Sequence, residues 1–271
     1  MPYAAVIGDP IDHSLSPLLH RAAYASAGIA WDYRKIRVAA EDLDAFIEAW
    51  DGDCRGLSVT MPHKHAVMAH LDHVDGLARA TGAVNTIVKQ GGLLVGFNTD
   101  VYGIVEAVRR SGRKSCERCV IVGAGSTASS ALAAVCELGT RRPIILARRF
   151  DGPHRALAAA YRLGIDPVAV PLRDERRVRA ALAEADLIVS TVPGGAAKPL
   201  AAHAISPTAS ILDVVYAPQP TPWQKRANEC GATFVSGLDM LVHQAILQIQ
   251  VMTAHSVDAS VLYDALRRKD D

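Results

Sequence analysis

The segment Cys119-Val-Ile-Val-Gly-Ala-Gly-Ser126 decides the fold of the second half of this 271-residue chain. Its apolar residues predict a short buried strand, and Gly123 and Gly125 predict a tight turn. A helix of small residues is expected over 126–138 and a second strand over 143–147. Strand, glycine turn, helix and strand in this order are typical of a dinucleotide-binding unit, because glycines let the backbone approach a pyrophosphate at the helix N-terminus.

The alternation of strands and helices continues beyond this unit. The glycine turn has the form Gly-x-Gly-x-x-Ala, with Ala128 in the third place. Further strands are predicted over 185–192, 211–215 and 232–235, and helices over 175–184 and 221–230. This alternation predicts a parallel, doubly wound sheet over about 115–237.

Two arginines end the strand that follows the glycine turn. A site for NAD places an acidic residue about 20 residues past the glycines, where it binds the ribose hydroxyls. Here that strand ends in Arg148-Arg149 instead. Guanidinium groups bind phosphate in bidentate fashion, so this pair favours the 2′-phosphate of NADP over a reading as two solvated loop residues.

The first half of the chain also alternates between strands and helices, which predicts a second α/β domain. Ser16 followed by Pro17 is typical of a helix start, with Ser16 as the N-cap. The strands expected here are 3–8, 31–38, 57–60, 83–88 and 93–97, and the helices are 16–28, 41–50, 65–80 and 101–110.

Lys64 follows the strand in Gly56-Leu-Ser-Val-Thr-Met-Pro-His-Lys64. Open α/β sheets hold their chemistry at the carboxyl ends of strands. A lysine at such an end can donate a proton to an oxygen that is gaining negative charge, although a solvated lysine at a helix start has the same pattern.

Polar residues around these elements have two interpretations each. Ser14 and Ser16 can cap a helix or bind a carboxylate at its N-terminus. Asn85 interrupts an apolar strand, so its amide needs partners from the protein or from a ligand. Asp100 can cap the helix 101–110 or present a carboxylate beside the next domain.

The region from 238 onwards predicts helices again. Gln244 and Gln248 lie one turn apart on an otherwise apolar stretch. A pair of glutamines in this spacing is typical of the solvated face of a helix.

Composition excludes several classes of protein. A formal net charge of +1 gives no basis for binding nucleic acid or an anionic membrane, and no apolar run reaches the length of a membrane span. The start of the chain lacks a signal-peptide pattern, so we expect a cytoplasmic protein. We interpret Cys116-Glu-Arg-Cys119 as a structural pair rather than a redox or zinc site. We interpret His70 and His73 as residues of a solvated helix rather than as metal ligands.

At this point the sequence resembles the shikimate dehydrogenase family over nearly its whole length. The resemblance rests on five motifs in the order of that family: Gly8-Asp-Pro-Ile-Asp-His-Ser-Leu-Ser-Pro17, Val59-Thr-Met-Pro-His-Lys64, Gly82-Ala-Val-Asn-Thr86, Asn98-Thr-Asp100 and Gly237-Leu-Asp-Met-Leu-Val-His-Gln244. It implies reduction of 3-dehydroshikimate to shikimate with NADPH in aromatic biosynthesis.

The resemblance also implies an architecture and a set of site residues. Residues 1–100, completed by the C-terminal helices 238–271, would bind substrate; 101–237 would form a Rossmann-like NADP-binding domain, with the active site in the cleft between the domains. Lys64 and Asp100 would be the catalytic pair. The expected substrate-binding residues are Ser14, Ser16, Thr60, Lys64, Asn85, Asp100, Tyr216 and Gln244. The expected cofactor-binding residues are Gly123, Ala124, Gly125, Ser126, Thr127, Arg148, Arg149, Val214 and Gly237.

Four positions depart from the usual motifs of that family. Ser58 stands where an Asn precedes Val-Thr, and Ser126 takes the fourth place of Gly-Ala-Gly-Gly. Ala147-Arg148-Arg149 replaces Asn-Arg-Thr, and Ser190-Thr-Val-Pro193 replaces Asn-Ala-Thr-Pro. The expected catalytic pair is unchanged. Arg148 matches the Arg of Asn-Arg-Thr, so NADP is still expected as the cofactor rather than NAD.

Three alternatives remain open at this stage. A related enzyme would act on quinate or an aminoshikimate, and a binding module of the same fold would sense shikimate without turning it over. A folate-linked dehydrogenase shares the two-domain plan, but Ser14 and Ser16 speak against it. Either a monomer or a homodimer is compatible with the sequence.

Overall fold

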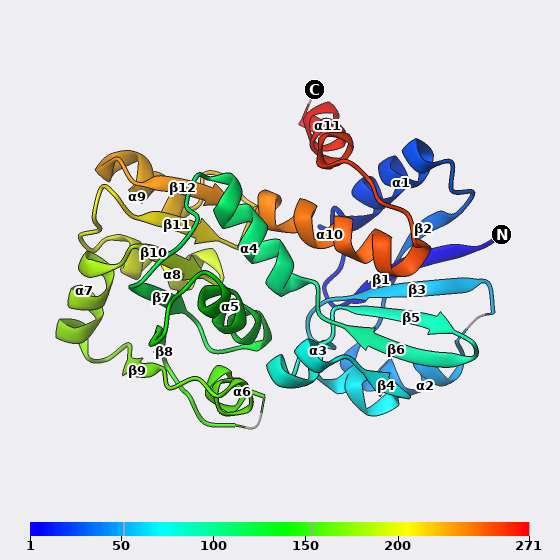
Figure 1. The fold of residues 1–271 in the computed structure, drawn as a ribbon, viewed down its shortest axis with the longest axis horizontal. Helices are drawn as coiled ribbons and strands as arrows, with labels where there is room; N and C mark the ends of the chain where they lie inside the picture. Colours follow the sequence, from blue (N-terminus) through cyan, green and yellow to red (C-terminus); the bar gives the residue numbers. More distant parts are fainter. Residues whose placement is uncertain (51, 153, 271) are drawn as a thin grey trace. The chain divides into compact units, whose positions relative to one another are not determined.

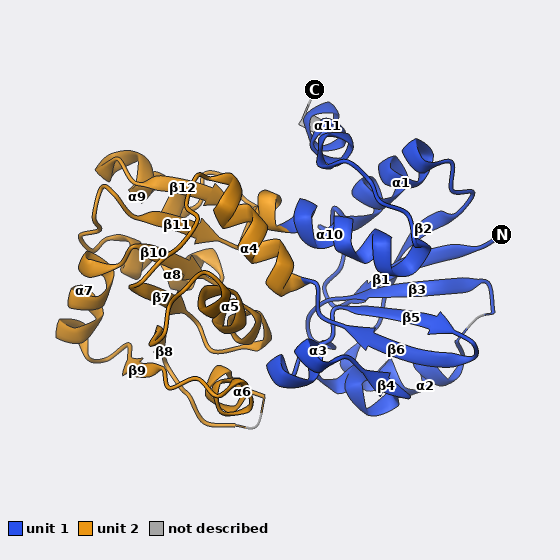
Figure 2. Cartoon of the chain, viewed as in Figure 1, with its two compact units in different colours: residues 1–99, 241–271 blue, residues 100–240 orange. Residues whose placement is uncertain are grey.

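The computed structural model describes residues 1–50, 52–152 and 154–270. The chain divides into two compact units, shown in Figure 2. Unit 1 contains Met1–Thr99 and Leu241–Asp271, and unit 2 contains Asp100–Met240. The chain therefore passes from one unit to the other twice, once at the start of a helix and once within a helix.

Unit 1 is built on a mixed sheet with the strand order β2-β1-β3-β5-β6-β4. Its strands, labelled in Figure 1, are β1 Tyr3–Gly8, β2 Asp32–Arg37, β3 Cys54–Val59, β4 His73–Val74, β5 Thr86–Gln90 and β6 Leu93–Phe97. β1 runs parallel to both β2 and β3, whereas β5 is antiparallel to β3 and β6. The carboxyl ends of β1 and β3 therefore lie side by side at one edge.

Helices and 3₁₀ turns complete unit 1. They are α1 Ser16–Ala27, η1 Ala40–Asp42, α2 Leu43–Glu48, η2 Ala66–His70, α3 Gly76–Thr81, the part of α10 Gly237–Thr253 from Leu241 onwards, and α11 Ala259–Asp270. α11 packs against α1, although the two are far apart in sequence. Buried side chains from the strands and α2, such as Ile7, Leu43, Leu57 and Ile87, form a core of this unit.

Unit 2 is a doubly wound α/β unit with the strand order β12-β11-β10-β7-β8-β9, and every pairing is parallel. Its elements are α4 Asp100–Arg110, β7 Cys119–Val122, α5 Ser126–Glu137, β8 Ile144–Ala147, α6 Ala156–Leu163, β9 Val168–Pro171, α7 Glu175–Glu184, β10 Leu187–Ser190, α8 Gly194–Ala201, β11 Ser210–Asp213, α9 Pro222–Cys230 and β12 Thr233–Ser236. The predicted parallel, doubly wound sheet is thus confirmed. The strand order reverses between β7 and β10, the point at which such sheets bind ligands.

Helices cover both faces of this second sheet. Cys119 and Ile121 of β7 join a core with α4, α5 and α6. Val120 and Val122 point to the other core, which includes residues of α7, α8 and α9. Successive side chains of a strand alternate between faces, so a continuous apolar run is what a sheet buried on both sides requires.

The predicted helix over 65–80 is wrong. The segment instead forms η2, the short strand β4 and α3. The backbone N–H of Asp72 donates to Leu94 O over 3.0 Å, and that of Asp75 donates to Gly96 O over 2.9 Å. Pairing with β6 therefore competes with the helix, and the Asp75 side chain then caps α3 by accepting from Leu77 N and Ala78 N.

The predicted cap of the first helix is also wrong in its residue. Leu15 is the N-cap of α1 and makes no side-chain capping bond, while Ser16 is the first helical residue. The hydroxyl of Ser14 accepts from Ser16 N at 3.4 Å. The prediction also omitted α6, β9 and α8, which are all short, with eight, four and eight residues.

Sulfur and imidazole groups are spread through both units. All five cysteines are free thiols. Hydrogen bonds from Cys119 and then Thr140 lower the pKa of Cys116 to about 7 against the opposing effect of burial.

The two histidines considered as metal ligands are His70 and His73. His70 Nε2 lies 3.0 Å from the carboxylate of Asp44. Within the described ranges, no group of three or more His, Cys, Asp or Glu side chains is arranged to hold a metal ion.

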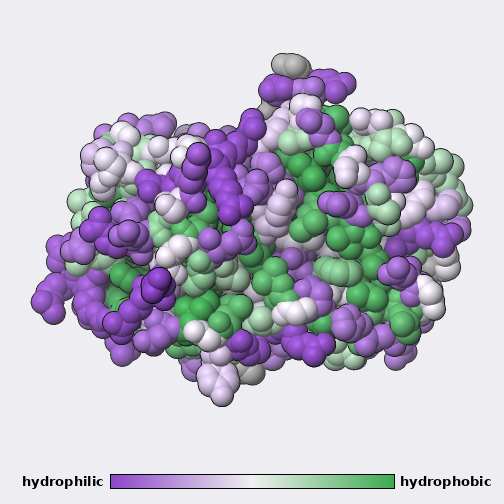
Figure 3. Space-filling model, viewed as in Figure 1, coloured by the Kyte–Doolittle hydropathy of each residue, from purple (hydrophilic) through white to green (hydrophobic). Residues whose placement is uncertain are grey.

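The outer surface mixes residues of opposite hydropathy. On the face drawn in Figure 3, hydrophilic and hydrophobic side chains are interspersed. Among the residues that the structure describes, the helices are too short or too polar to span a bilayer.

His20 is a fully buried imidazole in unit 1. Its ring stacks on Tyr33 with a centroid separation of 4.1 Å. Its Nδ1 lies 3.3 Å from Tyr24 Oη, and its Nε2 lies 3.3 Å from Gln248 Oε1. Burial lowers the pKa of His20 from 6.5 to about 3, although the bond to Gln248 opposes the shift.

This burial predicts a loss of stability in acid. Between about pH 6.5 and about pH 3 the unfolded chain binds a proton at His20 that the folded chain does not, so the free energy of unfolding falls as pH falls. The contribution is up to about 1.4 kcal/mol per pH unit. Urea unfolding across this range should show a shallower decline for His20→Gln than for the wild type. The exposed His255, changed to Gln, is the control; equal slopes for both variants would contradict the prediction.

Candidate active-site residues

The turn that carries Lys64 is anchored at three consecutive residues. The imidazole Nε2 of buried His63 lies 2.8 Å from Val38 O, and His65 Nδ1 lies 3.2 Å from Gly82 O. The carbonyl of Lys64 itself accepts from Val84 N at 2.7 Å. The backbone at Lys64 is therefore fixed just past the carboxyl end of β3, in a turn that precedes η2.

Three hydroxyl-bearing residues of the expected substrate set also come after the carboxyl ends of parallel strands. Thr60 comes directly after β3, and its N–H donates to Ile7 O at 3.0 Å. Its methyl group lies so close to Gly8 that a Cβ there would overlap it. Ser14 and Ser16 follow β1 at the start of α1. Parallel β1 and β3 thus deliver Ser14, Ser16, Thr60 and Lys64 from one edge.

Asn85 is buried, and the structure brings it together with Gln244. The Asn85 Oδ1 accepts from Thr99 N at 2.8 Å and from the Thr86 hydroxyl at 2.9 Å. Its Nδ2 donates to Thr99 Oγ1 at 2.8 Å and to Gln244 Oε1 at 3.4 Å. The expectation that Gln244 and Gln248 form a solvated face is wrong, because both are buried, with exposures of 7% and 2%.

Two residues of the expected substrate set belong to unit 2. Asp100 is buried and opens α4, directly after Thr99. Tyr216 follows β11 and is partly exposed. The remaining six residues of that set belong to unit 1.

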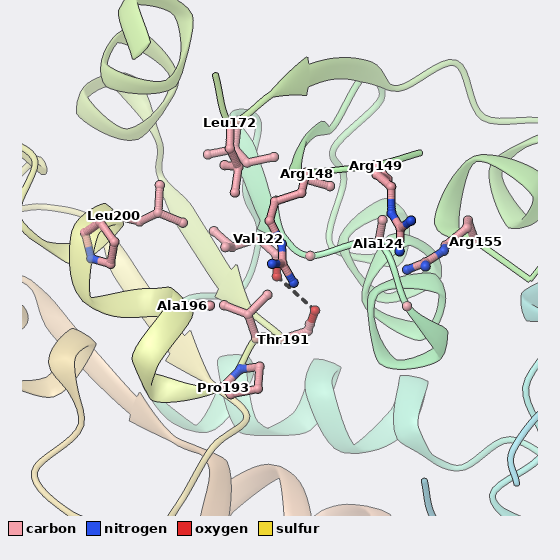
Figure 4. Close-up of a pocket in the computed structure, with 16 residues that line it drawn as sticks. Val122, Ala124, Arg148, Arg149, Arg155, Leu172, Thr191, Pro193, Ala196 and Leu200 are labelled. Atoms are coloured by element: carbon pink, nitrogen blue, oxygen red, sulfur yellow. Dashed lines mark hydrogen bonds between the residues drawn. The ribbon is translucent and has the colours of Figure 1, made fainter. Parts of the chain in front are cut away.

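Unit 2 contains a pocket of about 690 Å³ at the carboxyl ends of β7, β8 and β10. Its lining includes the glycine turn Gly123-Ala124-Gly125, the end of β8 and the segment Thr191–Pro193. Gly123 has φ +113°, and a Cβ on it would overlap the Thr191 hydroxyl. That hydroxyl donates to Val122 O at 2.9 Å, the bond drawn as a dashed line in Figure 4. The turn therefore needs glycine at 123 for steric reasons.

Three arginines line this pocket. Arg148 and Arg149 follow β8, as the sequence indicated, and Arg155 precedes α6. In Figure 4 the guanidinium groups of Arg149 and Arg155 extend toward the segment that carries Ala124. Sequence reasoning missed Arg155, because its signal, a basic residue before an Ala-rich helix, depends on recognising α6.

Four other residues expected to bind cofactor do not line the pocket. Ser126 and Thr127 begin α5 immediately after the turn, and Val214 follows β11. Gly237 opens α10, and a Cβ on it would lie 2.7 Å from Asp213 O. Gly237 therefore packs against the backbone that carries Val214.

A parallel sheet that reverses its order beside a glycine turn, with arginines at the next strand end, defines a dinucleotide-binding protein with a separate second unit. Two family comparisons agree with this division. Residues 6–87 match the shikimate dehydrogenase substrate binding domain. Residues 119–235 match the saccharopine dehydrogenase NADP binding domain.

Full-length relatives specify the family. The NADP⁺ shikimate dehydrogenase of Geobacillus kaustophilus is 34% identical in an alignment that covers 97% of this chain and 98% of the relative. The crystal structure of Mycobacterium tuberculosis shikimate dehydrogenase superposes with a TM-score of 0.88 at 32% identity, covering 99% of this chain and all of that one. A Thermus thermophilus shikimate 5-dehydrogenase solved with NADP(H) and shikimate gives a TM-score of 0.83 at 31% identity, covering 99% of each chain. The chain belongs to the NADP-dependent shikimate dehydrogenase family of oxidoreductases.

The two glycines of the turn should differ when they are changed. Gly123→Ala should destabilise the fold by about 1–3 kcal/mol, because its Cβ meets Thr191 and its φ is positive. Gly125→Ala meets no atom within 4 Å, so the variant should melt like the wild type. It should nevertheless bind NADPH more weakly, because a methyl group at the N-cap of α5 obstructs the approach of a pyrophosphate. Thermal melting and NADPH fluorescence titration separate the two effects. Unchanged NADPH affinity in Gly125→Ala would contradict this assignment.

Proposed function

We propose that this protein reduces 3-dehydroshikimate to shikimate with NADPH, in the shikimate pathway of aromatic amino-acid biosynthesis. The observation that carries the proposal is the anchored turn of Lys64 at the carboxyl end of β3, within a chain that matches shikimate dehydrogenases over 97% of its length. In this proposal, residues 1–100 with the helices from 238 onwards bind substrate, and 101–237 bind NADP. The observed compact units support this division, with boundaries at Thr99 and Met240.

The proposed proton donor is the Lys64 ammonium. When hydride from NADPH reaches the ketone carbon, the ketone oxygen becomes an alkoxide and takes a proton. The reduction therefore begins from the ammonium form, which gives up this proton to the alkoxide. The reverse oxidation needs the neutral amine and is therefore favoured at alkaline pH. In this proposal Asp100 orients the ammonium and accepts a hydrogen bond from a substrate hydroxyl.

The remaining polar residues suit a small carboxylate that carries several hydroxyls. Ser14 and Ser16 stand at the N-terminus of α1, where exposed N–H groups and the helix dipole favour an anion. Thr60, Asn85, Tyr216 and Gln244 are proposed to bind hydroxyl groups. Asn85 and Gln244 already meet through a hydrogen bond of 3.4 Å, which supports their joint role.

The pocket of unit 2 fits NADP. Open space at Gly125 and the N-terminus of α5 can accept a pyrophosphate. Arg148, Arg149 and Arg155 present three guanidinium groups near the strand end where the adenosine ribose of a dinucleotide lies. We propose that these arginines hold the 2′-phosphate. Ser126, Thr127, Val214 and Gly237 complete the proposed set of cofactor contacts.

A direct assay tests the proposed activity. Purified protein would be given shikimate or quinate with NADP⁺ or NAD⁺, at neutral and alkaline pH, and NADPH or NADH formation followed by absorbance. Turnover with shikimate and NADP⁺ should exceed that with the other pairs. Preferential turnover of quinate, or binding of shikimate without turnover, would overturn the proposal.

Lys64→Ala should lower kcat by about 10²–10⁴-fold while the KM for shikimate changes little, because Lys64 transfers a proton mainly in the transition state, accepting it in oxidation and donating it in reduction. Steady-state kinetics of shikimate oxidation measure both constants. Lys89→Ala, at an exposed position in β5, is the matched control and should resemble the wild type. A near-normal kcat in Lys64→Ala would remove Lys64 from the proton transfer.

Replacing Arg148 and Arg149 by Ala should raise the KM for NADP⁺ at least about tenfold and leave the KM for NAD⁺ nearly unchanged, because only NADP carries the 2′-phosphate. Arg155→Ala should shift the same ratio in the same direction. The exposed Arg176 of α7 provides the control substitution. Equal effects on both cofactors would refute the phosphate site.

A further inference from the structure

Gln248 is a buried amide in α10 to which the proposed mechanism gives no role. Its Oε1 accepts from Ser58 Oγ at 2.9 Å and lies 3.3 Å from His20 Nε2. Its Nε2 donates to Asn85 O and to Thr86 Oγ1, each at 2.9 Å. One side chain thus joins α10 to α1, to β3 and to the start of β5.

The direction of these hydrogen bonds is determined by chemistry. A backbone carbonyl can only accept, so the Gln248 NH₂ must face Asn85 O. Its Oε1 then faces Ser58 and His20, both of which must donate. Tyr33 in turn donates to Ser58 Oγ at 2.6 Å. Hydrogen-bond donation therefore has one direction here: Tyr33 donates to Ser58, and Ser58 donates to Gln248.

The same direction continues to Asn85. The Thr86 hydroxyl accepts from Gln248, so its own proton is directed to Asn85 Oδ1 at 2.9 Å. Asn85 Oδ1 also accepts from Thr99 N at 2.8 Å, and both of its lone pairs are then used. Meanwhile the Asn85 carbonyl accepts from Val59 N at 2.8 Å as well as from Gln248.

We propose that Gln248 is a positioning residue that fixes the orientation of the Asn85 amide. Its NH₂ group then points to Thr99 Oγ1 at 2.8 Å and to Gln244 Oε1 at 3.4 Å, and a substrate oxygen would replace Gln244 Oε1, the longer contact, as acceptor. This inference rests on the proposed function, since it specifies how one proposed substrate-binding residue acts. It also links Asn85 to β3, because Ser58 and Val59 precede the turn of Lys64.

The testing variant is Gln248→Glu, which keeps the shape and the acceptor oxygen toward Ser58. A carboxylate cannot donate to Asn85 O, and it draws the Thr86 proton away from Asn85 Oδ1. The KM for shikimate should rise at least about tenfold, the size expected for one lost hydrogen bond in a buried site. The KM for NADP⁺ should remain within about twofold, well below the tenfold step of 1.4 kcal/mol. Gln250→Glu is the control, since Gln250 lies on the same helix and is exposed.

Thr86→Val provides an independent test if Gln248→Glu fails to fold. It removes the hydroxyl between Gln248 and Asn85 with little change in volume, and it should produce the same selective rise in the KM for shikimate. Folded variants whose KM values match the Gln250→Glu control would overturn the inference. A parallel rise in both KM values would do the same, because it would indicate a general structural effect.

Calorimetric binding of shikimate separates this inference from the proposed function. A wild type that binds shikimate without turning it over would contradict the proposed activity, yet weaker binding by Gln248→Glu would still support the role of Gln248. A wild type that neither binds nor turns over shikimate would overturn both.

Discussion

A buried amide must match every donor and acceptor with a partner, and Asn85 is the residue at which this constraint acts most strongly. Its backbone N–H donates to Phe97 O at 3.0 Å, its carbonyl accepts from Val59 and Gln248, and its side chain binds Thr99. These bonds hold β3, β5 and β6 together at one edge of the sheet. They also fix Thr99, the residue from which the chain continues into Asp100 and α4. A single polar residue therefore sets the geometry at the proposed substrate site and at the exit from unit 1.

Unit 2 depends on a different kind of constraint, the steric one at its glycine turn. The backbone after β7 passes so close to Thr191, at the end of β10, that only hydrogen fits on Cα of Gly123. The close approach occurs where the strand order reverses, and it leaves the N-terminus of α5 open toward the pocket. Both units have an apolar core, but the strand ends at their sites are ordered differently: by buried hydrogen bonds around Asn85 in unit 1 and by a tight glycine turn in unit 2.

Much of this fold could be predicted from local sequence. The apolar runs predicted β1 and β7 with their observed bounds. The alternation of strands and helices in unit 2 predicted that its sheet is parallel. The errors have long-range causes: β6 pairs with the segment 72–75 and prevents a continuous helix over 65–80. Gln248 has its partner Ser58 190 residues away, so no local pattern could distinguish it from a solvated glutamine. Arg155 was missed because the helix behind it was missed.

The division of unit 1 into two segments affects the order in which the molecule can form. Unit 2 is continuous from Asp100 to Met240, whereas unit 1 needs Leu241–Asp271 in addition to its first 99 residues. As the chain leaves the ribosome, Ser58 and Asn85 emerge long before the glutamine that binds them. Their polar groups remain bonded to water until α10 is made, and burying them earlier would be costly. Domains of a growing chain generally fold as complete units, so the dinucleotide-binding unit is complete first and the other is completed only after Leu241–Asp271 have been made.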